Sequence, residues 1–277
     1  MSIECIGPQY NTDRILKPAR DTTIYTDILD VKDDSRYKIF LHQEPASINT
    51  KLYTLLNCWQ KFDLILTYNE DILKGCPNAK FLYFCTDTWI LPEQYKAIDV
   101  SFKRCLISNL TGFKRMCKAH EFRQVVYENQ QKFNPKLFVF FRSGVQPILP
   151  SIQNNPILSP ECSSKFMLFF EFQFSLIIEN TRERHCYTEK LIDCLITKTI
   201  PIYYGCENIQ DYFDTTGWIL IENESVDEII EKCKVIDEEY YNKYKKVIES
   251  NYRKVLTIID KYKQLNEVLA TVPGYKA

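Results

Sequence analysis

Short apolar runs alternate with helical patterns along the chain, and this alternation predicts an α/β fold. Apolar runs typical of buried strands lie at residues 37–42, 64–68, 81–85, 105–108, 137–141, 174–178, 200–204 and 218–221. Apolar residues spaced three or four positions apart, as in helices, span residues 49–62, 112–132, 165–172, 188–196, 225–233 and 238–268. Strands that alternate with helices form right-handed βαβ units, so we expect mostly parallel sheets.

The alternating segments form two consecutive series. We therefore predict two Rossmann-like domains facing a central cleft, the first formed by residues 1–98 and the second by residues 99–277. A return of the last helix to the N-terminal domain is one arrangement that this division allows. In such folds, ligands bind at the carboxyl ends of the strands, so polar residues that directly follow strands are the candidate site residues.

Composition excludes several function classes. The chain has 277 residues, of which 35 are basic and 36 acidic, and this balance argues against a general nucleic-acid binder. Its 7 glycines are too scattered for the common NAD(P) fingerprint, a P-loop or a serine-hydrolase elbow. The 11 cysteines include no Cys-x-x-Cys pair, and Cys117 and His120 lack a second ligand pair, so we predict no structural zinc site and no disulfide framework.

The chain shows neither a signal peptide nor an apolar span. Its first residues lack the basic and apolar regions of a secretory signal, and the longest uncharged run, residues 143–160, contains four prolines. We therefore expect a soluble, cytoplasmic protein.

Polar residues follow the expected strands in three places: at Gln43-Glu44-Pro45, at Ser108-Asn109, and at Glu179-Asn180, which is followed by Thr188-Glu189-Lys190. A helix that starts at Thr188 and carries Lys190 in its first turn, with Arg182 and Arg184 nearby, is a plausible diphosphate site. Glu189 is a candidate acceptor for ribose hydroxyls. The same residues also fit a solvated loop with an ordinary helix cap, and Glu44 also fits the exposed end of a strand.

The stretch FSLIIENTRERHCYTEKLIDCLITKTIPIYYG, residues 174–205, resembles the donor-binding signature of the α-1,3-fucosyltransferases, glycosyltransferase family 10. Glu179-Asn180-Thr181, Thr188-Glu189-Lys190 and the run IPIYYG agree with that signature in order and spacing. The segments HQEPAS, residues 42–47, and CLISNLTGFKR, residues 105–115, resemble two further stretches of the family. One feature departs from it, because the position of the family's tyrosine before Thr-Glu-Lys is occupied by Cys186 and the aromatic residue here is Tyr187.

The resemblance implies a GT-B fold, in which residues 1–98 form the acceptor-side domain and residues 99–277 the donor domain that binds the nucleotide sugar. It also implies an inverting, metal-independent transfer of fucose from GDP-fucose to a glycan hydroxyl. It implies Glu44 as the general base. The donor-binding residues that it implies are Asn109, Arg115, Glu179, Asn180, Tyr187, Glu189 and Lys190. Because the membrane stem of Golgi members is absent, it suggests a bacterial- or virus-like enzyme.

Three points stay open at this stage. The Cys186 departure leaves room for another nucleotide sugar as the donor, and a catalytically silent module that binds a sugar nucleotide or a glycan would carry the same motifs. Arg115 also fits an exposed cation on a charged helix that carries Lys114 and Lys118.

Overall fold

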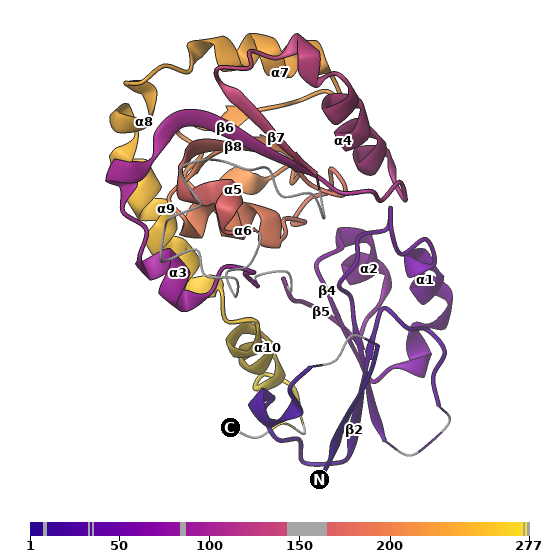
Figure 1. Cartoon of the computed structure of the whole chain (residues 1–277). Helices are drawn as coiled ribbons and strands as arrows, with labels where there is room; N and C mark the ends of the chain where they lie inside the picture. The colour runs from indigo at the N-terminus through magenta and orange to yellow at the C-terminus, as the bar shows by residue number, and fades with distance from the viewer. Residues whose placement is uncertain are drawn as a thin grey trace. The chain divides into compact units, whose positions relative to one another are not determined.

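The structure, a computed structural model, describes residues 1–7, 10–32, 34, 36–83, 87–142, 165–273 and 275. The chain divides into two compact units (Figure 1). Unit 1 comprises Met1–Thr86, Glu183–Cys186 and Asp260–Ala277, and unit 2 comprises Asp87–Arg182 and Tyr187–Ile259.

Unit 1 is built on one parallel sheet of five strands in the order β1-β2-β3-β4-β5. The strands are β1 (Ile3–Ile6), β2 (Thr22–Thr26), β3 (Tyr37–Leu41), β4 (Leu64–Thr67) and β5 (Ala79–Phe81). Its helices are α1 (Leu55–Cys58), α2 (Glu70–Gly75) and α10 (Lys261–Leu269), and its short 3-10 helices are η1 (Thr12–Arg14), η2 (Leu52–Thr54) and η3 (Trp59–Lys61).

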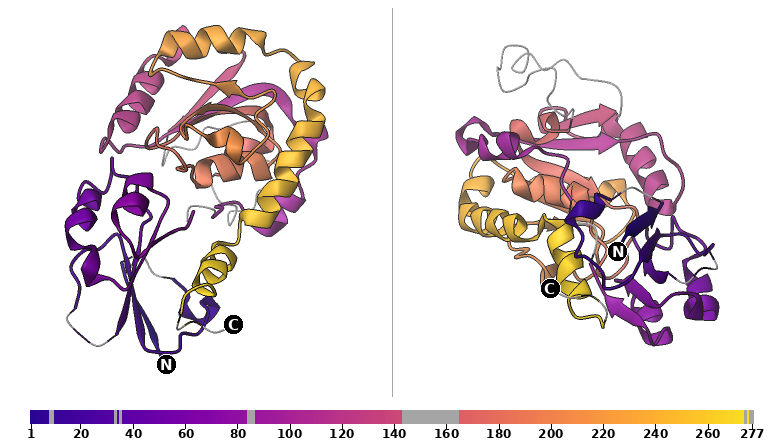
Figure 2. Two further views of the ribbon diagram at one scale, coloured as in Figure 1. Left: turned by 180° about the vertical axis from the view of Figure 1, so that it is seen from behind. Right: turned by 90° about the horizontal axis from the view of Figure 1, so that it is seen from below.

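The two faces of this sheet are covered by different parts of the chain. Each new strand is added on the same side of the one before it, so right-handed crossovers place their helices on one face only. On that face Phe40 and Ile65 pack with residues from η2, α1 and α2. On the opposite face Ile39 and Leu66 pack with residues from α10, which lies beside the strands of unit 1 in Figure 1 and in the left view of Figure 2. The last segment of the chain therefore completes the core of the first unit.

Unit 2 contains a second parallel sheet of five strands, in the order β10-β9-β8-β6-β7. The strands are β6 (Arg104–Thr111), β7 (Phe138–Arg142), β8 (Phe172–Ile178), β9 (Ile200–Tyr204) and β10 (Ile219–Leu220). The α-helices are α3 (Pro92–Lys96), α4 (Lys118–Glu128), α5 (Met167–Phe170), α6 (Glu189–Ile196), α7 (Val226–Lys232), α8 (Tyr240–Lys243) and α9 (Lys245–Ile258). The 3-10 helices are η4 (Val100–Phe102), η5 (Gln130–Lys132), η6 (Ile209–Asp211) and η7 (Cys233–Val235). After β7 the chain returns past β6 to form β8, so the order of the strands reverses between β6 and β8, and that reversal is the topological switch point of the sheet.

Along the chain, the first boundary between unit 1 and unit 2 falls between Thr86 and Asp87, whereas the predicted boundary lies between residues 98 and 99. The difference has a physical reason, because the Thr88 hydroxyl and the Trp89 N–H both donate to the buried carboxylate of Asp193 in unit 2. Helix α10 belongs to unit 1.

Most predicted strands are present, but β1 and β2 have no counterpart among the predictions. The strand predicted at residues 81–85 overlaps β5 only at Phe81, and residues 84–85 lie outside the described residues. Four predicted helices are shorter or interrupted, and of the one over residues 165–172 only Met167–Phe170 is helical. The pattern over residues 112–132 forms a helix only from Lys118 to Glu128, and the pattern over residues 49–62 is divided among η2, α1 and η3. The long pattern over residues 238–268 breaks twice, and Asp260 caps the last piece by accepting from the N–H groups of Tyr262 and Lys263. The predicted loop at residues 143–160 lies outside the described residues.

No helix in the described part of the chain is long and apolar enough to cross a membrane.

We expect Leu265→Ala to destabilise unit 1, because Leu265 of α10 is 1% exposed in the core that covers one face of the sheet. Removing a buried leucine typically costs about 2–5 kcal/mol. Urea unfolding monitored by circular dichroism measures the effect, with Lys263→Ala, an exposed position of the same helix, as the matched control. Equal stability of the two variants would contradict the role given to α10.

Candidate donor-binding site in unit 2

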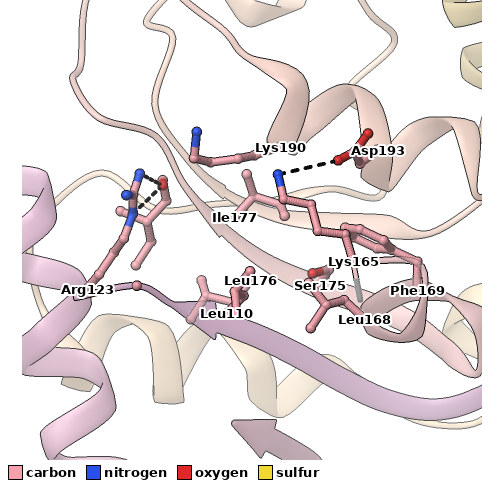
Figure 3. Close-up of a pocket in the computed structure, with 12 residues that line it drawn as sticks. Leu110, Arg123, Lys165, Leu168, Phe169, Ser175, Leu176, Ile177, Lys190 and Asp193 are labelled. Atoms are coloured by element: carbon pink, nitrogen blue, oxygen red, sulfur yellow. Dashed lines mark hydrogen bonds and ion pairs between the residues drawn. The ribbon is translucent and has the colours of Figure 1, made fainter. Parts of the chain in front are cut away.

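A cavity of about 180 Å³ lies at the switch point of unit 2, over the carboxyl-terminal halves of the paired strands β6 and β8 (Figure 3). Its lining comes from these strands and from α4, α5 and α6: Leu110, Gly112, Arg123, Lys165, Leu168, Phe169, Ser175, Leu176, Ile177, Ile178, Lys190 and Asp193. Ligands of doubly wound sheets bind at this position. The cavity is therefore the candidate site of unit 2.

A buried carboxylate joins the end of β8 to the start of α6. Glu179 follows β8 directly, and its side chain is fully buried. One carboxylate oxygen accepts from the Thr188 N–H at 2.9 Å and the other accepts from the Thr188 hydroxyl at 2.6 Å. Thr188 is also the N-cap of α6, as predicted, and its hydroxyl accepts from the Lys190 N–H. Burial raises the pKa of Glu179 above its usual value, although the charge of Lys190 opposes this.

Gly205 leaves the space that Glu179 occupies. A Cβ on Gly205 would lie 2.5 Å from Cγ of Glu179 and 2.6 Å from the hydroxyl oxygen of Tyr203. The glycine at the end of β9 is therefore required by close packing against the buried carboxylate, besides ending its strand.

Lys190 is held as a cation in the first turn of α6. Its Nζ lies 3.0 Å from Oε1 of Glu189, 3.1 Å from Oγ1 of Thr188 and 3.9 Å from Oε2 of Glu179. Burial alone would lower the pKa of Lys190, but the two carboxylates outweigh it and raise the pKa above its usual value. Glu189 is affected in the opposite sense, since burial opposes its charge while Lys190 and Lys165 bring its pKa down to about 2.

Arg123, which the sequence did not single out, reaches the end of β8 from α4. Its Nε donates to the carbonyl of Ile178 at 2.8 Å, and a second nitrogen donates to the same carbonyl and to Oδ1 of Asn180 at 2.9 Å. Arg123 thus belongs to the lining of the cavity, whereas the predicted Arg115 does not. In the sequence it is one of several cations in and before the same helix, and nothing in the pattern distinguishes it.

Lys165 and Asp193 form a second charged pair of the cavity (Figure 3). Nζ of Lys165 lies 3.9 Å from Oδ2 of Asp193 and 3.6 Å from Oε1 of Glu189. Oδ1 of Asp193 accepts from the Thr88 hydroxyl at 2.7 Å and from the Trp89 N–H at 2.9 Å. Burial raises the pKa of Asp193 to about 7, so this carboxyl titrates near neutral pH.

Of the seven predicted donor-binding residues, Lys190 belongs to the cavity lining. Glu179, Asn180 and Glu189 lie outside the lining but contact its residues Lys190, Arg123 and Lys165. The other three have different surroundings. Arg115 is half exposed and forms ion pairs with Glu121 and Glu128. Asn109 is buried within the sheet, where its amide donates to the carbonyl of Leu176 at 3.2 Å. Tyr187 is 2% exposed and packs edge-to-face against Tyr212 and Phe213.

Glu44, the predicted base, is an exposed residue of unit 1 that lies shortly after β3. The predicted residues Glu179, Asn180, Glu189 and Lys190 all belong to unit 2. Among the described residues, no three His, Cys, Asp or Glu side chains are grouped so that they could hold a metal ion.

Comparison with known proteins supports the resemblance found in the sequence. No protein-family model matches the chain. The α-(1,3)-fucosyltransferase FucT of Helicobacter pylori is 25% identical over 95 residues, which are 34% of this chain and 20% of that enzyme. The aligned part is thus about a fifth of the length of the curated relative.

Solved structures with a similar fold are glycosyltransferases. An α1,3-fucosyltransferase with GDP superposes with a TM-score of 0.51 and 15% identity, covering 92% of this chain and 82% of that one. TarM gives a TM-score of 0.53 at 12% identity, covering 92% of this chain and 55% of TarM. A UDP-forming α,α-trehalose-phosphate synthase from Burkholderia xenovorans gives 0.53 at 10% identity, covering 88% of this chain and 72% of the synthase.

The fold of the chain is that of the GT-B glycosyltransferases, which confirms the predicted fold class. The resemblance to α-1,3-fucosyltransferases is also confirmed, through the short sequence match with the Helicobacter enzyme and through the shared fold.

We expect Gly205→Ala to destabilise unit 2, because the added methyl group would displace Glu179 or Tyr203. Overpacking of this kind costs about 1–3 kcal/mol. Gly112→Ala is the matched control, since a Cβ there meets no atom within 4 Å. Urea unfolding compares the two variants, and an equal loss in both would show that the close contact has no energetic importance.

Proposed function

We propose that this protein is an inverting glycosyltransferase that transfers fucose from GDP-fucose to a hydroxyl group of a glycan. The observation that carries the proposal is the position of Lys190, which lies in the first turn of α6, lines the switch-point cavity and belongs to the segment that resembles the fucosyltransferase signature. Fucosyltransferase structures with GDP-fucose and with GDP share the fold, which supports this choice of donor.

In the proposed donor complex, the diphosphate binds at the N-terminus of α6. The free N–H groups and the dipole of a helix N-terminus favour an anion, and Lys190 adds a full positive charge there. Lys165 supplies a second cation that lines the same cavity, and Arg123 supplies guanidinium N–H groups. We propose that Lys165 and Arg123 perform the role predicted for Arg115, whose charge is paired with Glu121 and Glu128. Glu189 remains the proposed acceptor for the ribose hydroxyls.

In this proposal, the cations stabilise the leaving group. As the bond between the anomeric carbon and the β-phosphate oxygen breaks, its electron pair stays on the phosphate, where negative charge develops. Cations positioned before the reaction stabilise that charge without the cost of reorganisation. We assign Glu179 and Asn180 to positioning, because Glu179 orders the start of α6 through Thr188 and Asn180 accepts from Arg123.

Glu44 is the proposed general base. It removes the proton from the acceptor hydroxyl while the hydroxyl oxygen bonds to the anomeric carbon, and GDP leaves from the opposite side. The configuration at that carbon is therefore inverted. In this scheme the reaction needs only side chains of the protein.

Two alternatives to a fucosyltransferase that uses GDP-fucose are retained, and the first follows from the surroundings of Cys186 and Tyr187. The family's tyrosine position holds Cys186, which is buried in unit 1, and Tyr187 is buried against two aromatic rings in unit 2. Cys186 has no ring that could stack on guanine, and the packing of Tyr187 does not support stacking there. Another nucleotide sugar is therefore the second candidate donor. A catalytically silent binding module is the third candidate; it would bind GDP without forming product.

We expect Glu44→Gln to retain GDP binding and to lose transfer by at least about a hundredfold, the usual effect of removing a general base. The measurement is turnover of GDP-fucose with a panel of glycan acceptors. Glu4→Gln, which changes another carboxylate of unit 1, is the matched control and should remain active. Full turnover by the Glu44 variant would rule out this base.

We expect Lys190→Ala to weaken GDP binding by about tenfold or more, since a charge-assisted phosphate contact contributes about 1.5–3 kcal/mol. Isothermal titration calorimetry with GDP measures the change, and UDP serves as the comparison ligand. Lys198→Ala is the matched control, because Lys198 lies beyond the other end of α6, paired with Glu249. Equal affinity of the two variants for GDP would refute the diphosphate site, and tighter binding of UDP than of GDP would favour the second candidate donor.

A further inference from the structure

In unit 1, two consecutive backbone N–H groups point to one carboxylate. The Gln43 N–H donates to Oδ1 of Asp27 at 3.0 Å, and the Glu44 N–H donates to Oδ2 at 2.8 Å. The amide of Asn49 lies 3.4 Å from Oδ1. Consecutive N–H groups that converge in this way form an anion-binding nest, and here the anion is a side chain of the same chain.

The backbone of Asp27 has an uncommon conformation, which places its carboxylate beside these N–H groups. It follows β2 directly, and its own N–H donates to the carbonyl of Leu41 at the end of β3. Its φ is +56°, in the left-handed region, which aspartate and asparagine adopt more readily than most residues. The chain thus turns sharply after β2, at the position where the carboxylate meets the segment that follows β3.

The same segment is held from its carbonyl side by a buried histidine. Nε2 of His42 lies 2.8 Å from the carbonyl of Glu44, so it carries the proton, and Nδ1 accepts from the Thr67 hydroxyl at 2.8 Å. Burial lowers the pKa of His42 to about 4, and its ring stacks on Tyr68 with centroids 4.3 Å apart. Both backbone polar groups of Glu44 therefore have fixed partners, while its side chain extends from an exposed position.

We propose that Asp27 is a positioning residue for the carboxylate of Glu44. This inference rests on the proposed function, in which Glu44 is the general base. With its N–H and carbonyl both held, the backbone of Glu44 has one orientation, and this limits the directions that its side chain can take. The charged form of Asp27 is required, because an asparagine has only one acceptor oxygen and would present its NH2 group to the second N–H.

The test is the variant Asp27→Asn, which keeps the side-chain volume and tolerates the left-handed conformation. Assays run at a pH well above 6, because burial raises the pKa of Asp27 to about 6. We expect kcat to fall by tenfold to about a hundredfold, the range for a misplaced catalytic group, while the KM for GDP-fucose and the affinity for GDP stay unchanged. Normalising kcat to the number of GDP-binding sites found by calorimetry removes any contribution from unfolded protein.

The matched control is Asp63→Asn. Asp63 also accepts a backbone N–H in unit 1, that of Lys38 at 2.7 Å, but it lies at the start of β4 rather than at the carboxyl end of a strand. We expect this variant to keep the normal kcat. A loss as large as that of Asp27→Asn would assign the effect to general loosening of the unit and would overturn the inference.

A double variant separates the inference from the proposed function. In a Glu44→Gln background, Asp27→Asn should cause no further loss, because its effect passes through Glu44. An additional loss of the same size in that background would overturn the inference, and so would full activity of Asp27→Asn beside an inactive Glu44→Gln. Full activity of Glu44→Gln itself would instead overturn the proposed base, and the inference with it.

Discussion

The geometry of the candidate site depends on one buried carboxylate, that of Glu179. A carboxylate with no exposed surface is costly to bury unless its oxygens accept hydrogen bonds, and both oxygens of Glu179 are bonded by Thr188. The Glu179–Thr188 contact joins the end of β8 to the start of α6. It therefore determines where α6 begins and where Lys190, in its first turn, lies. Gly205 leaves room for the carboxylate, and Arg123 holds the backbone one residue before it. Residues from four separate segments therefore meet around a single ionisable group.

The topology of each sheet determines what the rest of the chain must do. In unit 2 the strand order reverses between β6 and β8, and the cavity lies at this reversal. In unit 1 the order never reverses, so the crossovers cover one face and the other face needs a further element. Helix α10 covers it, although more than 170 residues separate it from β5. The last helix of the chain therefore packs on the sheet of unit 1, whose second face would otherwise expose its apolar side chains.

Much of the fold follows from the spacing of apolar residues, whereas the site follows only in part. The alternation of apolar runs predicted the parallel sheet of unit 2, but in unit 1 it missed the strands β1 and β2. The Thr188 cap was predicted from a single residue before a helical pattern. Arg123 was missed in favour of Arg115, because spacing along a helix does not reveal which of several cations meets a carbonyl of a distant strand. The burial of Tyr187 depends on Tyr212 and Phe213, which follow it by more than twenty positions. Such long-range packing decides exposure, and local patterns contain no information about it.

The chain has only 7 glycines and no glycine-rich loop, and its proposed site contains charged side chains instead. Glycine-rich loops bind phosphate through backbone N–H groups, which carry no net charge, whereas the lining of the proposed site contains the cations Arg123, Lys165 and Lys190. Three carboxylates, Glu179, Glu189 and Asp193, lie among these cations. Burial brings the pKa of Asp193 to about 7, so protonation of this group reduces the negative charge around the cavity. A diphosphate bound at the proposed site would raise the pKa of Asp193 further, because its negative charge disfavours the ionised carboxylate, and binding near pH 7 would therefore be accompanied by uptake of a proton.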